Sequence, residues 1–212
     1  MIIAGSVLIG ILQTIIICSI WKKYNIFSAK YKERKSQMIF GCLLVVSVVL
    51  NGLLLTYQEE AIICINIFVL YTLLSAIAGI DLKTKKIPNK ILAVGIGIRI
   101  GMIAIQAVLY TDTVKLVLLN SGTGFLFGLF FLLLLSFISK HGIGYGDVKL
   151  FAWLGLCVGL ADVYNILFYS VFVAAVVGTY LLLIKRKSKK TEMPFGPFVW
   201  LGTYIMLIFN LI

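Results

Sequence analysis

The sequence predicts an all-α, polytopic integral membrane helical bundle, and three observations carry that prediction. Hydrophobic residues make up 61% of the 212 residues and charged residues only 13%, whereas soluble domains have about 45–50% apolar and about 25% charged residues. The apolar residues form runs long enough to cross a bilayer, which takes roughly 20 residues. The basic residues gather in alternate connections between these runs. A cytosolic enzyme and a disordered protein are therefore both excluded.

About eight transmembrane helices are expected. The candidate spans are residues 2–21, 38–57, 61–80, 88–109, 115–138, 148–161, 163–184 and 195–212. The sixth span is the weakest, because its apolar run is short and only Ala161 and Asp162 separate it from the seventh. These two spans form either a tight hairpin or one broken helix, so seven spans remain an alternative. Small-residue pairs are expected to let helices pack closely, namely Gly97 with Gly101, Gly124 with Gly128, and Gly155 with Gly159.

The distribution of charge predicts the topology. The odd-numbered connections hold 17 of the 19 Lys and Arg residues, and cytoplasmic loops are enriched in these residues. Both termini are therefore expected outside, with the odd-numbered connections in the cytoplasm. Topology accounts for the net charge of +11, so no nucleic-acid partner is expected. No connection exceeds about sixteen residues, which predicts one membrane-embedded domain over residues 1–212.

The cysteines indicate neither a disulfide framework nor a metal site. They lie scattered in apolar runs, without a CxxC pair or companion histidines, at Cys18, Cys42, Cys64 and Cys157. Structural zinc needs four such ligands at close spacing. We therefore expect core or lipid-facing thiols and no bound metal.

Two acidic residues stand apart from the other six, which fall in predicted loops. Asp81 follows directly on the apolar run that ends at Ile80, and Asp147 ends a glycine-rich turn that begins at His141. The topology places both at the cytoplasmic boundary, and carboxylates at membrane depth are costly and usually functional. The alternative is that Asp81 is the polar end of its span and Asp147 the N-cap of the sixth span.

The neighbours of the two aspartates favour a functional role. After Asp81, Pro88 and Asn89 end one helix and begin the next. Before Asp147, every second side chain is missing, at Gly142, Gly144 and Gly146. A helix start needs no such clearing, but a backbone that must contact another peptide does. Two backbone-exposed helix ends, each with one aspartate, suggest a carboxylate dyad.

Such a dyad suits hydrolysis, since two like charges close together raise one of the two pKa values. One aspartate takes a proton from water, while the other, still protonated, polarises the scissile carbonyl and later protonates the leaving amine. No serine–histidine or cysteine–histidine pair competes, because His141 is the sole histidine and is expected in an interfacial loop. Lys149 either lowers the pKa of Asp147 or anchors the helix at the interface.

Three short motifs occur in order along the chain. Residues 81–89 read DLKTKKIPN, residues 144–150 read GYGDVKL, and residues 193–198 read MPFGPF. With these motifs the chain resembles, over roughly residues 70–204, the type IV prepilin peptidases, which are GxGD-type intramembrane aspartyl proteases. The resemblance implies that Asp81 and Asp147 are the catalytic dyad. It implies that Pro194, Gly196 and Pro197 shape the cytoplasmic rim and the start of the last span, without a chemical step.

The resemblance also implies substrates and location. Family members sit in the cytoplasmic membrane and cut pilin or pseudopilin precursors of type IV pilus and protein secretion systems, on the cytoplasmic side after a short basic leader. Many also N-methylate the product with S-adenosylmethionine and have a longer first cytoplasmic region with zinc-binding cysteine pairs. The corresponding loop here, from Trp21 to Gln37, has no such pairs. We therefore expect a compact peptidase without methyltransferase activity, and hence without a cofactor.

Two other classes of function remain as alternatives. An ion-coupled transporter or channel would use aspartates as a proton relay, usually near the bilayer midplane. Arg99 is the one feature that favours it, because it lies ~16 Å past Pro88 along a helix and a buried cation needs a partner. We expect a structural pairing of Arg99 with an acidic or amide group, such as Asn66 or Asn120. A non-catalytic assembly scaffold would need neither aspartate.

Overall fold

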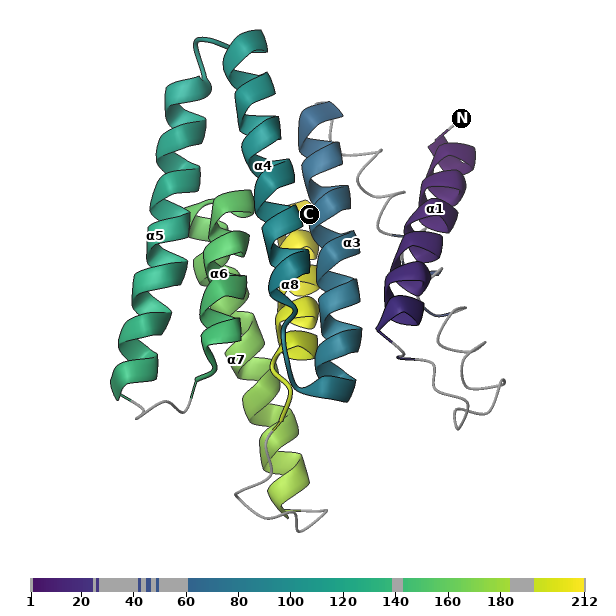
Figure 1. Cartoon of the computed structure of the whole chain (residues 1–212), viewed down its shortest axis with the longest axis vertical. Helices are drawn as coiled ribbons and strands as arrows, with labels where there is room; N and C mark the ends of the chain where they lie inside the picture. Colours follow the sequence, from purple (N-terminus) through teal and green to yellow (C-terminus); the bar gives the residue numbers. More distant parts are fainter. Residues whose placement is uncertain are drawn as a thin grey trace.

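The computed structural model describes residues 2–24, 26, 42, 45, 46, 49, 61–138, 143–183 and 193–211. This part of the chain is helical throughout its regular structure, as predicted, and Figure 1 shows the arrangement. Its helices are α1 (Ile2–Lys23), α3 (Ala61–Thr84), α4 (Asn89–Leu109), α5 (Val114–Ile138), α6 (Tyr145–Val158), α7 (Leu160–Leu183) and α8 (Gly196–Leu211).

Five of these helices are long and apolar enough to cross a membrane, namely α1, α3, α4, α5 and α7. The fold is therefore that of a multi-pass membrane protein. The 14 residues of α6 extend only ~21 Å, and α8 is a shorter apolar helix. The predicted span at 38–57 lies largely outside the described residues. The number of eight spans and the outer position of both termini stay predictions.

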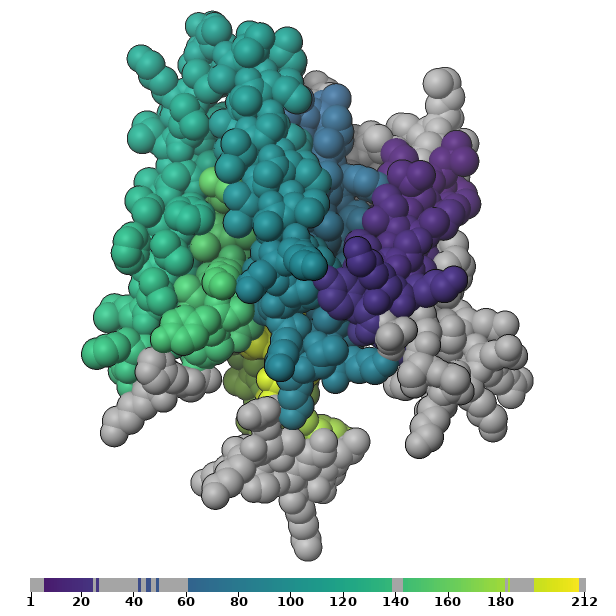
Figure 2. Space-filling model, viewed as in Figure 1, coloured from purple at the N-terminus to yellow at the C-terminus, as the bar shows by residue number. Residues whose placement is uncertain are grey.

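The central helices α3, α4 and α8 lie between α1 on one side and α5, α6 and α7 on the other (Figure 1). In Figure 2, α4 separates the side chains of α5 on the left from those of α1 on the right. Trp21 joins α1 to the centre, because its indole packs on Gly79 and its Nε1 donates to the Ala76 carbonyl at 3.1 Å. The bundle is thus built around α3.

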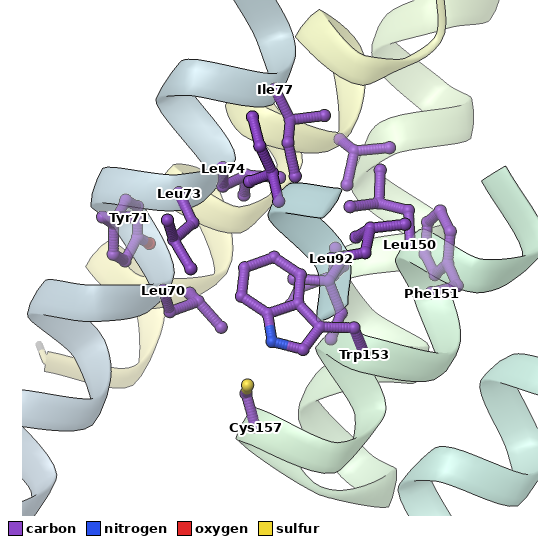
Figure 3. Packing of buried hydrophobic residues seen from close by; sticks show 14 of the residues in the cluster. Leu70, Tyr71, Leu73, Leu74, Ile77, Leu92, Leu150, Phe151, Trp153 and Cys157 are labelled. Atoms are coloured by element: carbon purple, nitrogen blue, oxygen red, sulfur yellow. The ribbon is translucent and has the colours of Figure 1, made fainter. Parts of the chain in front are cut away.

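The core is formed where α3, α4 and α6 meet. Trp153, Tyr71 and Phe151 are its largest fully buried side chains. Figure 3 shows aliphatic side chains of α3 and α4 around them, including Leu70, Leu74 and Leu92. Two further hydrogen bonds attach α8 to α3. Tyr71 donates its hydroxyl to the Thr203 carbonyl at 2.6 Å, and Trp200 Nε1 donates to Ser75 Oγ at 2.7 Å.

The sixth and seventh predicted spans form a tight hairpin rather than one broken helix. α6 ends at Val158, and Gly159 has a φ of +87°. α7 then runs back past α6 toward the end of the bundle at which α6 begins (Figure 1). Glycine adopts this left-handed conformation without the cost that other residues meet. The side chain of Asn120 accepts a hydrogen bond from the Leu160 N–H at 3.1 Å, which satisfies a donor that a helix start leaves without an intrahelical partner.

Two of the three predicted glycine pairs lie at helix contacts. A Cβ added at Gly124 would meet the carbonyl oxygen of Gly155, and one added at Gly128 would meet that of Phe151. Gly159 likewise lies against Asn120. For Gly97 and Gly101 the prediction is wrong within the described residues, because no atom lies within 4 Å of an added Cβ. The predicted pairs that are confirmed therefore join α5 to the α6–α7 hairpin, whereas the close contact of α4 lies at Gly95, where an added Cβ would be 2.7 Å from the Trp153 ring.

Arg99 has partners other than those predicted. Its Nε donates to the Leu156 carbonyl and its Nη2 to Ser121 Oγ, both at 3.1 Å. Asn66 instead donates to the Cys157 carbonyl at 2.9 Å. The reason lies in the early end of α6, because the last four carbonyl groups of a helix have no intrahelical donor and accept from side chains nearby.

Candidate active site

The end of α3 and the start of α6 face a common cavity of about 350 Å³, which we call the aspartate cavity. It is lined by Asp81, Lys85, Lys86, Ile87, Asn89, Gly144, Tyr145, Gly146, Asp147 and Lys149. The first two sequence motifs thus supply the whole lining. The structure brings the two predicted aspartates to one site, as a dyad requires.

Asp81 lies in the last turn of α3 and is buried, with 4% of its surface exposed. The helix ends three residues later, where Lys85 takes a φ of +52° and donates its N–H to the Asp81 carbonyl at 2.8 Å. A left-handed residue at this position is a common helix stop. Pro88 then restarts the chain as α4 from an extended conformation. The chain reversal between α3 and α4 keeps Asp81 beside the cavity.

The third motif reaches the site through its backbone. Gly196 is the first residue of α8, and its N–H donates to Asp81 Oδ2 at 2.8 Å. That N–H has no intrahelical acceptor, and Pro197, which has no N–H, fits the first turn for the same reason. A Cβ at Gly196 would lie 3.0 Å from Asp81 Oδ2. Gly196 therefore does more than shape the rim, since it holds the carboxylate directly.

Asp147 is the third residue of α6 and is partly buried. The N-cap of α6 is Gly144, so the alternative in which Asp147 caps the helix is wrong. Burial raises the pKa of the Asp147 carboxyl from 3.8 to about 6, the nearby Asp81 charge adds to the rise, and a hydrogen bond with the Gly144 backbone opposes it. The two carboxyl groups thus interact electrostatically, and Asp147 keeps its proton to an unusually high pH.

The glycines of the second motif contact the chain itself. A Cβ added at Gly146 would lie 3.2 Å from Ile87 Cβ, and one at Gly144 would lie 3.2 Å from Asp147 Oδ2. Gly142 and His141 lie outside the described residues. Gly146 thus lets the start of α6 approach Ile87 in the α3–α4 connection. That these glycines leave room for the backbone of a substrate stays a prediction.

Lys149 and Asn89 connect the two sides of the aspartate cavity. Lys149 Nζ donates to Asn89 Oδ1 at 3.3 Å, across 60 residues of sequence. Lys149 therefore has a described partner on α4, and both of its predicted roles, on the Asp147 pKa and as an anchor at the interface, stay predictions. Pro194 lies with Gly196 and Pro197 in the segment that begins α8.

Four lining residues were not singled out from the sequence, namely Lys85, Lys86, Ile87 and Tyr145. Their position inside the first two motifs was the available signal. Tyr145 is 59% exposed and lies between Gly144 and Gly146.

Comparisons with known proteins point to one family. The model of the type IV leader peptidase family matches residues 68–179. The prepilin leader peptidase/N-methyltransferase of Bacillus subtilis is 30% identical over 142 residues, which is 67% of this chain and 54% of that protein. The protein of the same name from Xanthomonas campestris pv. campestris is 30% identical over 143 residues, 67% of this chain and 49% of its own length.

A third relative of that name, from Pseudomonas putida, is 39% identical over 71 residues, 34% of this chain and 25% of its own length. The chain thus spans about half the length, or less, of the curated relatives it matches. No solved structure gives a significant match. The family match covers more than half of the chain and includes both aspartates of the cavity, so the chain belongs to the type IV leader peptidase family.

Proposed function

We propose that the protein is an aspartic endopeptidase that removes the basic leader peptide from type IV prepilin-like precursors at the cytoplasmic membrane face. Membership of the leader peptidase family supports this activity. The observation that carries the mechanism is that Asp81 and Asp147, from distant parts of the sequence, line one cavity at one end of the bundle.

The surroundings of the two carboxyl groups differ, and the difference suggests their roles. Asp81 accepts a hydrogen bond from the Gly196 N–H at the start of α8, and a helix N-terminus favours a negative charge. Asp147 has a pKa of about 6, partly because the charge of Asp81 opposes its ionisation. Asp81 is therefore the ionised base, and Asp147 is the protonated acid.

The proposed reaction keeps one proton on the dyad. Asp81 accepts a proton from water, and the resulting hydroxide attacks the scissile carbonyl carbon, whose oxygen is polarised by the Asp147 proton. The tetrahedral intermediate then collapses, the C–N bond breaks, and Asp147 gives its proton to the leaving amine. Asp81 holds the proton from water at that point. Transfer of this proton to Asp147 restores the starting state.

The central experiment compares Asp81→Asn and Asp147→Asn with the unmodified protein in detergent, using a synthetic precursor peptide and intact mass as readout. Each variant should lose at least about 1,000-fold in kcat/KM, because neither amide can exchange the required proton. Asp112→Asn, in an exposed turn, is the matched control and should keep full activity. Cleavage by either dyad variant within tenfold of the unmodified protein contradicts the proposal, provided that size-exclusion chromatography shows both folded.

The proposed roles of the two aspartates predict how kcat/KM depends on pH. kcat/KM should fall as the pH rises above about 6, because the Asp147 carboxyl of the free enzyme then loses its proton. It should fall again at low pH, when Asp81 becomes protonated. A rate that keeps rising up to pH 9 would mean that Asp147 is not the acid.

We propose further that the chain acts without methyl transfer and without a cofactor. The names of the relatives include N-methyltransferase, but only about half of their length matches this chain. Incubating the protein and its cleaved product with S-adenosylmethionine should leave the mass of the product unchanged. A mass increase of one methyl group would contradict this part of the proposal.

A further inference from the structure

A second cavity lies toward the opposite end of the bundle, around Arg99, and we call it the Arg99 cavity. Its volume is about 450 Å³, and its lining comes from α3, α4, α5, α8, the end of α6 and the start of α7. The cavity exists because α6 ends at Val158, about halfway up its neighbours in Figure 1. The short hairpin leaves the upper part of the bundle unfilled.

Arg99 brings a buried positive charge to this cavity. Its side chain is 7% exposed, and its two hydrogen bonds go to neutral acceptors, the Leu156 carbonyl and Ser121 Oγ. A guanidinium has five N–H donors and keeps its proton in any protein environment, so three donors have no acceptor among the described residues. Asp162, the acidic residue of the lining, is not among the hydrogen-bond partners of Arg99, and a buried charge without a counter-charge is costly. An anion in the cavity would remove that cost.

Neutral groups in the same cavity define what else the ligand must offer. Gln106 Oε1 is buried without a hydrogen-bond donor in the described part of the chain, and Gln106 and Thr113 line the cavity near the α4–α5 turn. A ligand with a hydroxyl or an amine could donate a hydrogen bond to Gln106 Oε1 and so satisfy this acceptor. The rest of the lining includes apolar side chains such as Ile63, Val117 and Leu207.

We propose that the Arg99 cavity binds a phosphate ester that carries free hydroxyl groups, of the kind found in the headgroup of phosphatidylglycerol. The phosphate would accept the unused N–H groups of Arg99, and a hydroxyl would donate to Gln106 Oε1. The cavity volume lies within the roughly 300–1,000 Å³ range of small-molecule sites. Because the two cavities share no lining residue, the proposed site is one of structural stabilisation and takes no part in peptide cleavage.

The test measures thermal unfolding of the full chain in a neutral detergent with four additions. The additions are dioleoyl phosphatidylglycerol, dioleoyl phosphatidylcholine, free glycerol 3-phosphate and buffer. Two variants address the site from different sides: Arg99→Gln removes the charge, and Val117→Phe fills the cavity while keeping Arg99. Leu116→Phe is the matched control, because Leu116 is 70% exposed on the outer face of the same helix.

Phosphatidylglycerol should raise the unfolding temperature of the unmodified protein and of Leu116→Phe. Its apparent affinity should fall at least tenfold in Arg99→Gln and in Val117→Phe. The same pattern with free glycerol 3-phosphate also supports the site and assigns it a soluble ligand. Equal effects of the two lipids, or undiminished binding in Val117→Phe, overturn the proposal, and this second variant decides the matter if Arg99→Gln fails to fold.

Discussion

Gly196 and Asp81 lie 115 residues apart in sequence, yet a 2.8 Å hydrogen bond joins them. The Gly196 N–H has no acceptor within α8 because Gly196 is the first residue of that helix. The absence of a side chain lets the Asp81 carboxylate approach. The requirement for glycine is thus steric, because any residue except proline would supply the same N–H. Through this contact the third motif takes part in the site, although it lies far from the other two motifs in the sequence.

Gly196→Ala tests this contact. An added Cβ would lie 3.0 Å from Asp81 Oδ2 and 3.1 Å from Asp81 Cβ, so the Asp81 side chain must move by a few tenths of an ångström. Because a shift of about 1 Å costs on the order of 100-fold in rate, we expect this smaller shift to lower kcat by about tenfold with little change in KM, measured with the precursor peptide. Gly122→Ala is the control, because an added Cβ there has open space. Equal kcat values for both variants would refute the positioning role.

Asp147→Asn should stabilise the protein above pH 6 and have little effect near pH 4. The pKa of Asp147 is about 6 in the fold against an ordinary 3.8, so the stability that its proton contributes is present below pH 3.8 and lost as the pH rises through 6. The shift corresponds to at most ~3 kcal/mol, and solvent screening of this partly exposed group lowers the expected gain to ~1 kcal/mol.

Thermal unfolding of this variant and of the unmodified protein between pH 4 and pH 8 measures the difference. A gap that stays constant over that range would show that Asp147 titrates alike in the folded and unfolded chain.

At the scale of the helices, the close contact of α5 with α6 sets where Asp147 lies. Gly124 and Gly155 face each other backbone to backbone, and Gly159 turns the chain into α7. Small residues at such contacts let helices approach where lipid supplies no hydrophobic drive. The start of α6, with Asp147, is therefore held from its opposite end.

Gly155→Ala should destabilise the bundle. An added Cβ would overlap the Gly124 carbonyl, and the helices must separate at a cost of about 1–3 kcal/mol. Gly97→Ala, where an added Cβ meets no described atom, should instead gain up to about 1 kcal/mol of helix propensity. Chemical or thermal unfolding in detergent distinguishes the two. Similar effects of both substitutions would mean that the α5–α6 contact is not specific.

At the scale of the whole molecule, the protein has two unlike ends. The aspartate cavity lies at one end among Lys85, Lys86 and Lys149, and the Arg99 cavity lies toward the other. Basic connections favour the cytoplasm. The predicted orientation therefore turns the aspartate cavity toward the cytoplasm.

Cysteine labelling tests this orientation. In a variant whose native cysteines are replaced by serine, Thr111→Cys should react with a membrane-impermeant maleimide in intact cells, because Thr111 lies in the exposed α4–α5 turn. Lys86→Cys, exposed beside the aspartate cavity, should react after the membrane is opened and not before. The reverse pattern would invert the topology and remove the aspartates from the cytoplasmic face.

The sequence predicted the described helices to within a few residues, because runs of about 20 apolar residues have no stable state in a bilayer other than a helix. It also singled out Asp81 and Asp147, which line one cavity, since acidic residues are so few. It failed at the partners of Arg99 and at Gly97 and Gly101. Such contacts depend on which helix faces which, and apolar patterns hold little information on that.

The sequence by itself determined that this is a helical membrane protein with two aspartates at helix ends, because transfer free energies of whole segments are sums over local composition. The tertiary structure alone decided that the two aspartates line one cavity, that Gly196 holds Asp81, and that a short hairpin leaves space around Arg99. Each of these depends on rotation and depth of one helix relative to another. Packing of side chains and single hydrogen bonds between distant segments set those quantities, and no stretch of sequence contains them.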